Sequence, residues 1–216
     1  IQEGWPFNLG GASNSSPILV NLDSDPDLEI VFGDQAGNIH ALKKDGVTQM
    51  PGFPISLSSA VIGSLAMTDV NGDGIKEFAA CLQNNSIVFF NQQGTVLWTT
   101  PAGGTLRSGP VIASLRNDNS RQIITATQTG NLIVLNSDNT PYPNFPVSIG
   151  GAVLGPPAIA DLNGDGIHEI IVATLNGNLS AINSATGQNL NGFPVAMQGG
   201  TQNPITIANL DADPNP

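Results

Sequence analysis

The chain has 216 residues, 40% of them hydrophobic, which is enough for a buried core in one sizeable domain or in part of a larger one. Its formal net charge is -11 and it contains only six Lys and Arg residues, so the composition excludes nucleic acid and anionic lipid as partners. No run of 18 apolar residues occurs, so we expect no membrane insertion.

Two kinds of landmark recur along the chain at the same intervals. The first is an aromatic-proline pair, found at Trp5-Pro6, Phe53-Pro54, Phe145-Pro146 and Phe193-Pro194, with Trp98 as a looser member. The second is a polar loop, which begins at Asn21, Asp69, Ser114, Asp161 and Asn209. Both series advance in steps of 48, 45, 47 and 48 residues, so we interpret the chain as an array of repeat units.

The repeat covers residues 1–216 as one region. Residues 1–9 are predicted to be the outer strand of a preceding unit, and the units that follow span approximately 10–57, 58–102, 103–149, 150–197 and, in part, 198–216. In the fourth unit, strands are expected at 156–160, 170–174, 179–183 and 192–197. Val, Ile and Thr favour pleated structure in these segments, and the intervening LNGN and SATGQ segments favour turns.

A four-stranded unit of about 40 to 50 residues that repeats is typical of a β-propeller blade. We therefore predict an all-β fold, a β-propeller with about four complete four-stranded blades plus terminal strands. A β-sandwich or a solenoid of sheets is the alternative, but a sandwich does not require such strict recurrence.

Three of the polar loops carry oxygen-bearing groups at alternate positions. The first, NLDSDPDLE, offers Asn21, Asp23, Asp25, Asp27 and Glu29. The second, DVNGDGIKE, offers Asp69, Asn71, Asp73, the backbone carbonyl of Ile75, and Glu77. The fourth, DLNGDGIHE, offers Asp161, Asn163, Asp165, the carbonyl of Ile167, and Glu169. Because alternate groups of a tight loop can converge on one hard cation, and calcium prefers several oxygen ligands, we predict three complete Ca²⁺ sites.

The third and fifth loops depart from this pattern. The third, SLRNDNSRQ, places Ser114, Arg116, Asp118, Ser120 and Gln122 at the ligand positions, so we expect no ion in the loop 114–122. Our hypothesis is that a guanidinium group, from Arg116 or Arg121, stands there in place of the cation. The fifth loop offers Asn209, Asp211 and Asp213 but ends before its ninth position, so we expect a partial fourth site at the C-terminus.

The distribution of charge favours a ligand array over a merely soluble surface. Of 17 acidic residues, only Glu3, Asp34, Asp45 and Asp138 lie outside the five loops. Carboxylates crowded in this way repel one another, so bound cations are expected to stabilise the fold. An EF-hand is disfavoured because its twelfth position holds Ala80 or Val172 here, and magnesium is disfavoured because it prefers octahedral geometry with retained waters.

These loops resemble the FG-GAP or VCBS repeats of the integrin α-subunit type. DVNGDGIKE and DLNGDGIHE match the DxDxDGxxD/E calcium loop of that family, and GWPF, GFPIS and GFPVA resemble the linking strand of its secreted bacterial members. The resemblance implies a calcium-binding β-propeller with the loops between the first two strands of each blade. Members usually have around seven blades, so we expect these 216 residues to be part of a larger propeller and not to close a ring by themselves.

The sequence offers little for catalysis. His40 lies in an expected strand and His168 in the fourth calcium loop, so both are interpreted as packing or surface residues. The loop carboxylates are expected to have lowered pKa values, the opposite of what a general acid needs, and Asp34 and Asp45 are interpreted as turn formers. Cys81 lies in an apolar run and is expected to be a buried, inert thiol.

We therefore expect a non-catalytic, calcium-binding module, secreted or at the cell surface, that binds an extracellular protein or glycan. The extracellular expectation rests on the family resemblance and on the millimolar calcium outside cells, which fills loops of moderate affinity. The alternative is an accessory, non-catalytic propeller of a larger extracellular enzyme, such as a peptidase or a polysaccharide lyase or hydrolase.

Overall fold

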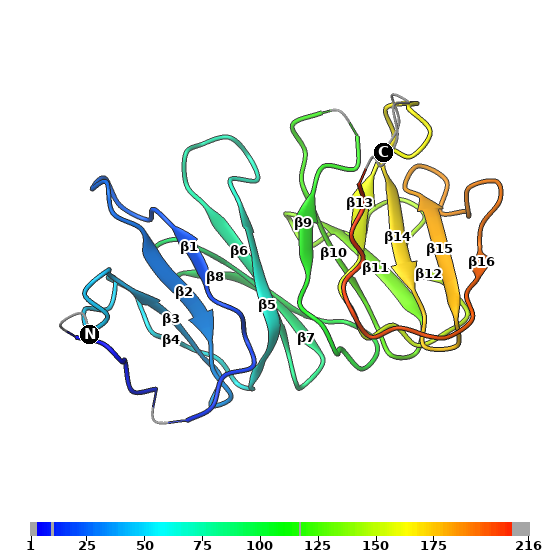
Figure 1. Cartoon of the computed structure of the whole chain (residues 1–216). Coiled ribbons are helices and arrows are strands. Elements are labelled where there is room, and N and C mark those ends of the chain that lie inside the picture. The colour runs from blue at the N-terminus through cyan, green and yellow to red at the C-terminus, as the bar shows by residue number, and fades with distance from the viewer. Residues whose placement is uncertain (1–3, 10, 117, 209–216) are drawn as a thin grey trace.

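The computed structural model describes residues 4–9, 11–116 and 118–208, and in these ranges it contains sixteen β-strands and no helix (Figure 1). The first sheet consists of β1 (Ile18–Val20), β2 (Glu29–Gly33), β3 (Asn38–Leu42) and β4 (Ile55–Ser56). The second consists of β5 (Val61–Thr68), β6 (Glu77–Leu82), β7 (Ser86–Asn91) and β8 (Val96–Pro101). The third consists of β9 (Val111–Ala113), β10 (Gln122–Ala126), β11 (Asn131–Asn136) and β12 (Val147–Ser148). The fourth consists of β13 (Ala158–Ala160), β14 (Glu169–Ala173), β15 (Asn178–Asn183) and β16 (Val195–Ala196).

Each sheet is an antiparallel meander in which strands adjacent in the chain are adjacent in the sheet. The polar loop of each repeat joins the first strand to the second. Its base is closed by the same pairing in every sheet, between the residue before the loop and the ninth residue of the loop. These pairs are Val20 with Glu29, Thr68 with Glu77, Ala113 with Gln122 and Ala160 with Glu169. The repeat found in the sequence is therefore a structural repeat in register.

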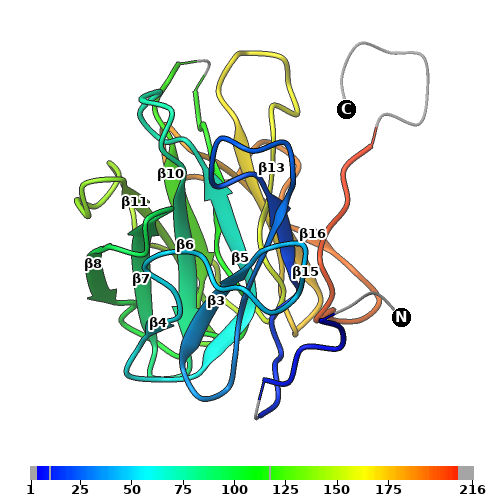
Figure 2. The ribbon, with the colours of Figure 1, turned by 90° about the vertical axis from the view of Figure 1, so that its left-hand side faces the viewer.

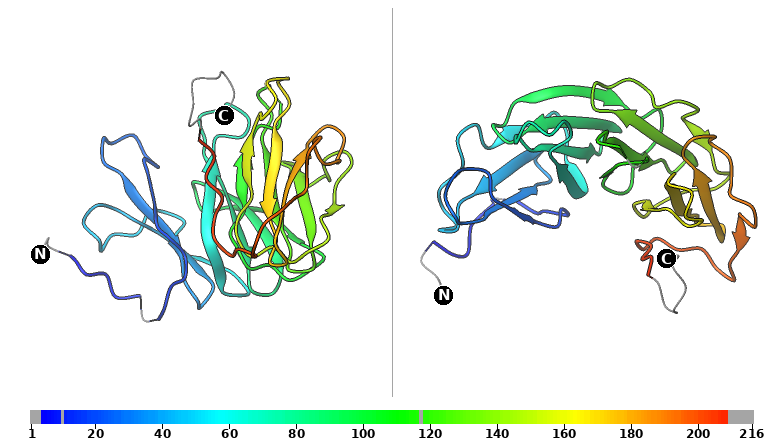
Figure 3. Two further views of the ribbon diagram at one scale, coloured as in Figure 1. Left: turned by 45° about the vertical axis from the view of Figure 1, so that its right-hand side comes forward. Right: turned by 90° about the horizontal axis from the view of Figure 1, so that it is seen from above.

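The four sheets stand side by side and follow an open arc, which is seen most clearly from above in the right-hand view of Figure 3. The first and fourth sheets do not meet, and the described residues close no ring. All four polar loops lie at the same end of the sheets, the upper end in Figure 1 and Figure 2. The fold is the β-propeller arrangement expected from the sequence, and the predicted four-stranded blades are confirmed.

The sheets are held together by apolar side chains on both of their faces. The strands β6, β10 and β14 are buried along their whole length, which explains why their sequences are nearly continuous apolar runs. Between the first and second sheets, Phe78 and Phe90 stack with ring centroids 5.1 Å apart, and both are fully buried. The alternate residues of β6 and β7, which include Cys81 and Phe89, face the third sheet, so the second blade contributes to two interfaces.

The interface between the second and third sheets contains the only cysteine of the chain. Cys81 is fully buried, its Sγ lies 3.7 Å from Oγ1 of Thr125, and burial raises the pKa of the thiol to about 12. The expected burial of the thiol is confirmed. At the outer edge of this interface, the ring of Trp98 stacks on Phe89 at 5.0 Å and its Nε1 donates to the carbonyl of Ser137 at 2.8 Å.

The N-terminal segment packs against part of the outward face of the first sheet. The ring of Phe7 lies 6.5 Å from that of Phe32 and 5.8 Å from that of His40, measured between centroids. The segment thus packs against the face of the first sheet that a preceding blade would occupy. Residues 4–9 form no strand, and the prediction that residues 1–9 are the outer strand of a preceding unit stays a prediction. No helix in the described part of the chain is long and apolar enough to cross a membrane.

Candidate metal-binding loops

The ninth side chain of each polar loop reaches back across the loop and fixes its start. The carboxylates of Glu29, Glu77 and Glu169 accept a hydrogen bond from the backbone N–H of the second loop residue, at 2.7, 3.0 and 3.0 Å. These glutamates are 1%, 5% and 0% exposed. Because a carboxylate is costly to bury without partners, this position needs compensating groups from inside the loop.

The second and fourth loops have the same internal hydrogen bonds. Asp69 accepts N–H groups from Gly72 and Gly74 at 2.6 and 2.8 Å, and Asp161 accepts those of Gly164 and Gly166 at 2.8 Å each. All four glycines have positive φ values between 74° and 85°, a backbone conformation that side chains disfavour. The two loops therefore share one conformation, set by the aspartate at position 1 and the glycines at positions 4 and 6.

The side chains at loop positions 3 and 5 are also linked in these two loops. Asn71 and Asp73 are joined by an amide-to-carboxylate hydrogen bond of 3.0 Å, and Asn163 and Asp165 by an equivalent one of 3.0 Å. Backbone N–H groups fix their orientation further, as in the 2.7 Å bond from Ile75 to Asp73. The predicted ligand side chains are thus held in the loop by its own turns.

The pKa values of the loop acids shift in both directions. Hydrogen bonds from backbone N–H groups, led by those of Gly74 and Gly166, lower the pKa of Asp69 and Asp161. Burial raises the pKa of Glu77, and its closeness to Asp73 and Asp69 adds to the effect. The pKa is thus lowered for the two partly buried aspartates and raised for Glu77, whose carboxylate is shielded from water; the expectation that a bound cation lowers the pKa of the loop carboxylates stays a prediction.

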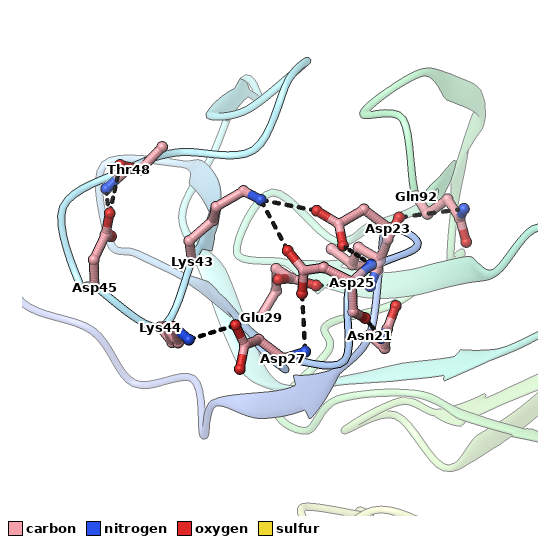
Figure 4. Close-up of polar contacts among 11 residues, drawn as sticks. Asn21, Asp23, Asp25, Asp27, Glu29, Lys43, Lys44, Asp45, Thr48 and Gln92 are labelled. Atoms are coloured by element: carbon pink, nitrogen blue, oxygen red, sulfur yellow. Dashed lines mark hydrogen bonds and ion pairs between the residues drawn. The ribbon is translucent and has the colours of Figure 1, made fainter.

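The first loop is where carboxylates converge most closely (Figure 4). Ligand atoms of Asp23, Asp25 and Glu29 all lie within 4.8 Å of one another, the one such group of three in the part of the chain that the structure describes. Oε1 of Glu29 is buried and has no hydrogen-bond partner. A buried carboxylate oxygen without a partner, beside two other carboxylates, fits a hard cation such as calcium.

Two other predicted ligands of the first loop point to different partners. The side chain of Asn21 donates to the backbone carbonyl of Asp25. The carboxylate of Asp27 forms an ion pair with Lys44, with Nζ 2.6 Å from Oδ2. The structure therefore brings together three of the five predicted side chains of this loop.

The third loop keeps the architecture but has a neutral amide at its ninth position. Gln122 replaces the glutamate, and its Oε1 accepts the N–H of Leu115 at 3.2 Å. Nη1 of Arg121 donates to the carbonyls of Ser120 and Asp118 at 3.0 and 3.2 Å. Ser120 holds the position whose carbonyl is a predicted calcium ligand in the second and fourth loops. The guanidinium of Arg121 therefore contacts a carbonyl at one of the ligand positions, and its replacement of a cation in this loop stays a prediction.

The fifth loop cannot be compared with the others. Its predicted ligands Asn209, Asp211 and Asp213 lie outside the described residues.

The two acids interpreted as turn formers differ in burial. Asp45 caps its turn by accepting N–H groups of Val47 and Thr48 at 2.9 and 2.8 Å, as expected. Asp34 also caps a turn, through the N–H of Asn38 at 2.7 Å, but it is only 2% exposed. Its second partner is Nε2 of His40, 3.0 Å away.

The Asp34 and His40 pair is a packing element. Nε2 of Gln49 donates to Nδ1 of His40 at 2.9 Å, so Nε2 of the imidazole carries the proton that faces Asp34. Burial raises the pKa of Asp34, but hydrogen bonds from His40 and Asn38 outweigh it and leave the pKa below its usual value. The ring stacks on Phe32 at 5.2 Å, which confirms the interpretation of His40 as a packing residue.

A polar cavity of about 620 Å³ lies at the opposite end of the sheets from the acidic loops. Its walls come from the turns between second and third strands and from the connections between sheets, and they include Asn14, Gln35, Gln83, Asn85 and Arg107. Gln35 and Gln83 occupy equivalent positions in two repeats, 48 residues apart, and both side chains are exposed. The only sequence signal for this cavity is the recurring glutamine, which is found again at Gln128.

Comparison with known proteins identifies the fold. No model of a protein family matches the chain, and no curated protein matches it. Among solved structures, the chain is similar to Saccharomyces cerevisiae Sqt1, with a TM-score of 0.70 and 15% identity, over 94% of this chain and 54% of that one. It is also similar to BBS1N in a complex with ARL6DN, with a TM-score of 0.62 and 10% identity, over 89% and 53% of the two chains.

A third similar structure is BamB from Moraxella catarrhalis, with a TM-score of 0.52 and 12% identity, over 81% and 49% of the two chains. All three are β-propeller proteins, which confirms the fold class. The chain spans about half the length of each of these structures. At these identities the likeness concerns the fold alone.

Proposed function

We propose that the chain is a calcium-stabilised β-propeller region of the FG-GAP or VCBS type. The observation that carries this proposal is the convergence of Asp23, Asp25 and Glu29 within 4.8 Å, with the buried Oε1 of Glu29 lacking a partner. The second and fourth loops support it, because they repeat the same oxygen-bearing positions in a shared conformation. Bound calcium offsets the repulsion between the loop carboxylates and links the first two strands of a blade.

The residues that would hold the ion follow from the loops. In the second loop they are Asp69, Asn71, Asp73, the carbonyl of Ile75, and Glu77; in the fourth they are Asp161, Asn163, Asp165, the carbonyl of Ile167, and Glu169. In the first they are Asp23, Asp25 and Glu29, with Asn21 and Asp27 adjacent. Carboxylates, carbonyls and amide oxygens are the donors that calcium prefers, and the set contains no sulfur or nitrogen ligand.

Substitution of single loop aspartates tests the metal sites. We expect Asp165→Asn to weaken calcium binding at the fourth loop so that calorimetric titration detects one ion fewer per chain, because one carboxylate ligand becomes a neutral amide. The matched control is Asp118→Asn in the third loop, which makes the same change where no ion is expected. Equal stoichiometry for Asp165→Asn and the parent protein would contradict the proposed site.

We further propose that the propeller is a non-catalytic binding module, secreted or at the cell surface, whose partner is a protein or a glycan. The similar solved structures support a role in protein interaction, since BBS1N is described in a complex with ARL6DN. The buried engagement of His40 by Asp34, Gln49 and Phe32 agrees with the absence of a catalytic role for that residue.

The polar cavity opposite the acidic loops is the best candidate for the partner site. A volume of about 620 Å³ lies within the usual range for ligand pockets. Amides such as those of Gln35 and Gln83 can both donate and accept hydrogen bonds, which suits hydroxyl or peptide groups. Arg107 adds a cation that can pair with a carboxylate, and its Nε donates to Oε1 of Gln128 at 3.2 Å.

The prediction for this cavity is that acidic ligands bind there and depend on Arg107. An array of immobilised oligosaccharides and peptides, each with and without carboxylate groups, provides the probes. Arg107→Ala is expected to weaken binding to the acidic members by about ten- to one hundredfold, the usual cost of losing a hydrogen bond to a charged group. Arg121→Ala removes an arginine at the opposite end of the sheets and should leave binding unchanged. Full retention of binding by Arg107→Ala would contradict the assignment of this cavity.

A further inference from the structure

Among the described residues, acids of the first loop form ion pairs with lysines, which the acids of the second and fourth loops do not. Nζ of Lys43 lies 2.9 Å from Oδ2 of Asp23 and 3.3 Å from Oδ2 of Asp25, and it reaches both from the turn that follows β3 (Figure 4). The ammonium group therefore bridges two of the three carboxylates that converge in this loop. In the described ranges, no lysine or arginine forms an ion pair with an acid of the second or fourth loop.

The repeat shows that this lysine is a departure from the pattern. The residues aligned with Lys43 in the second, third and fourth units are all asparagines, at positions 91, 136 and 183. In the fourth unit, Nδ2 of Asn183 donates to Oε1 of Glu169 at 3.1 Å. The equivalent oxygen in the first unit, Oε1 of Glu29, is buried and has no partner. Lys43 thus engages the aspartates and leaves the glutamate oxygen unpaired.

The contacts of Lys43 also shift the pKa values of the groups that they join. The hydrogen bond from Lys43 lowers the pKa of Asp23, and hydrogen bonds to Asp23 and Asp25 raise the pKa of Lys43. A divalent cation bound by these aspartates requires the same two carboxylates that the ammonium group contacts. The two cations therefore compete for one set of oxygens.

We propose that Lys43 is an intramolecular competitor for the cation of the first loop, and that it makes this loop the weakest of the three calcium sites. The inference rests on the proposed calcium function. The lysine side chain is 35% exposed, so its ion pairs are weak enough to be displaced by calcium. The second and fourth loops fill first as calcium rises, and the first loop fills only after Lys43 has left the aspartates.

The experiment measures the calcium affinity of the first loop in isolation from the other two. In a background that carries Asp73→Asn and Asp165→Asn, calorimetric titration with calcium is compared with and without Lys43→Asn, which installs the residue of the other three units. Removal of two exposed ion pairs is expected to tighten binding by about tenfold. Circular dichroism at the titration temperature verifies that each variant is folded.

Two control variants separate competition at the site from a general effect of charge. Lys76→Asn removes one positive charge from the second loop and should leave the first-loop affinity unchanged. Lys43→Arg keeps a cation beside the aspartates and should keep the affinity low. Saturating calcium is expected to raise the thermal unfolding midpoint of the parent protein. This calcium-induced shift should be larger in the single variant Lys43→Asn.

The outcomes are distinct from those that test the calcium function itself. The competitor role would be overturned if Lys43→Asn left the calcium affinity of the first loop unchanged or weakened it. It would also be overturned if the first loop bound no calcium either with or without Lys43→Asn. Failure of the proposed function is seen elsewhere, as the absence of calcium binding that depends on Asp73 and Asp165 in the parent protein.

Discussion

Chelation of calcium is expected to lower the thermal unfolding midpoint by roughly 10 to 30 °C. A site held at one hundred times its dissociation constant stabilises the folded state by about 2.7 kcal/mol, so two strong sites and a weaker third contribute roughly 5 to 8 kcal/mol. For a domain of about 200 residues, each kcal/mol corresponds to about 2 to 4 °C. The acids concerned are crowded in the folded protein, with three ligand atoms within 4.8 Å in the first loop alone.

The measurement is a pair of melts at neutral pH, one at saturating calcium and one with excess EGTA. Excess magnesium added to the chelated sample should restore little of the loss, because magnesium favours octahedral coordination with retained waters. An unchanged midpoint after chelation would show that the loops are held by their own hydrogen bonds and that the metal is not structural.

The second large effect concerns the packing of blades against one another. Phe90 is fully buried between the first and second sheets and stacks on Phe78 at 5.1 Å. Phe90→Ala is expected to destabilise the fold by about 3 to 5 kcal/mol, because it removes buried apolar surface and leaves a cavity. The thermal midpoint should therefore fall by about 6 to 20 °C.

Leu97→Ala is the matched control, since Leu97 lies in the same sheet and is 49% exposed. Its effect should be within about 0.5 kcal/mol. If Phe90→Ala does not accumulate in folded form, Phe90→Leu provides a milder version with the same sign. A loss below 1 kcal/mol for Phe90→Ala would mean that the two sheets do not pack through this residue.

The blade architecture could be predicted from the sequence because each structural requirement is repeated four times. A polar loop, two apolar strands and an aromatic segment recur at intervals of 45 to 48 residues, and the strand pairing closes each of the four described loops at its ninth residue. A single unit would have been ambiguous, since short apolar runs fit more than one fold. The recurrence removed that ambiguity, and the open arc agrees with the expectation that these residues alone close no ring.

The candidate site was predictable only in part, because its chemistry depends on residues from outside the loops. Lys43 and Lys44 follow a different strand, and their contacts with the loop acids depend on how that turn folds over the first loop. The alignment of the repeats contained a signal, since Lys43 stands where the other units have asparagine.

Burial was the other property that the sequence pattern did not reveal. Glu77 and Asp34 are acids in polar segments, yet both are almost fully buried, with opposite shifts of their pKa. In Glu77 the loss of hydration dominates, whereas in Asp34 hydrogen bonds from His40 and Asn38 outweigh it. Such a balance depends on three-dimensional neighbours and not on spacing along the chain.

The most direct test of the account is a crystal structure of this chain grown in millimolar calcium, with anomalous diffraction used to locate the ions. We predict one ion in each of the loops 21–29, 69–77 and 161–169, with the lowest occupancy in the first, and the guanidinium of Arg121 in place of an ion at 114–122. Loops that contain no calcium at saturating concentration, or a fully occupied ion beside Asp118, would contradict it.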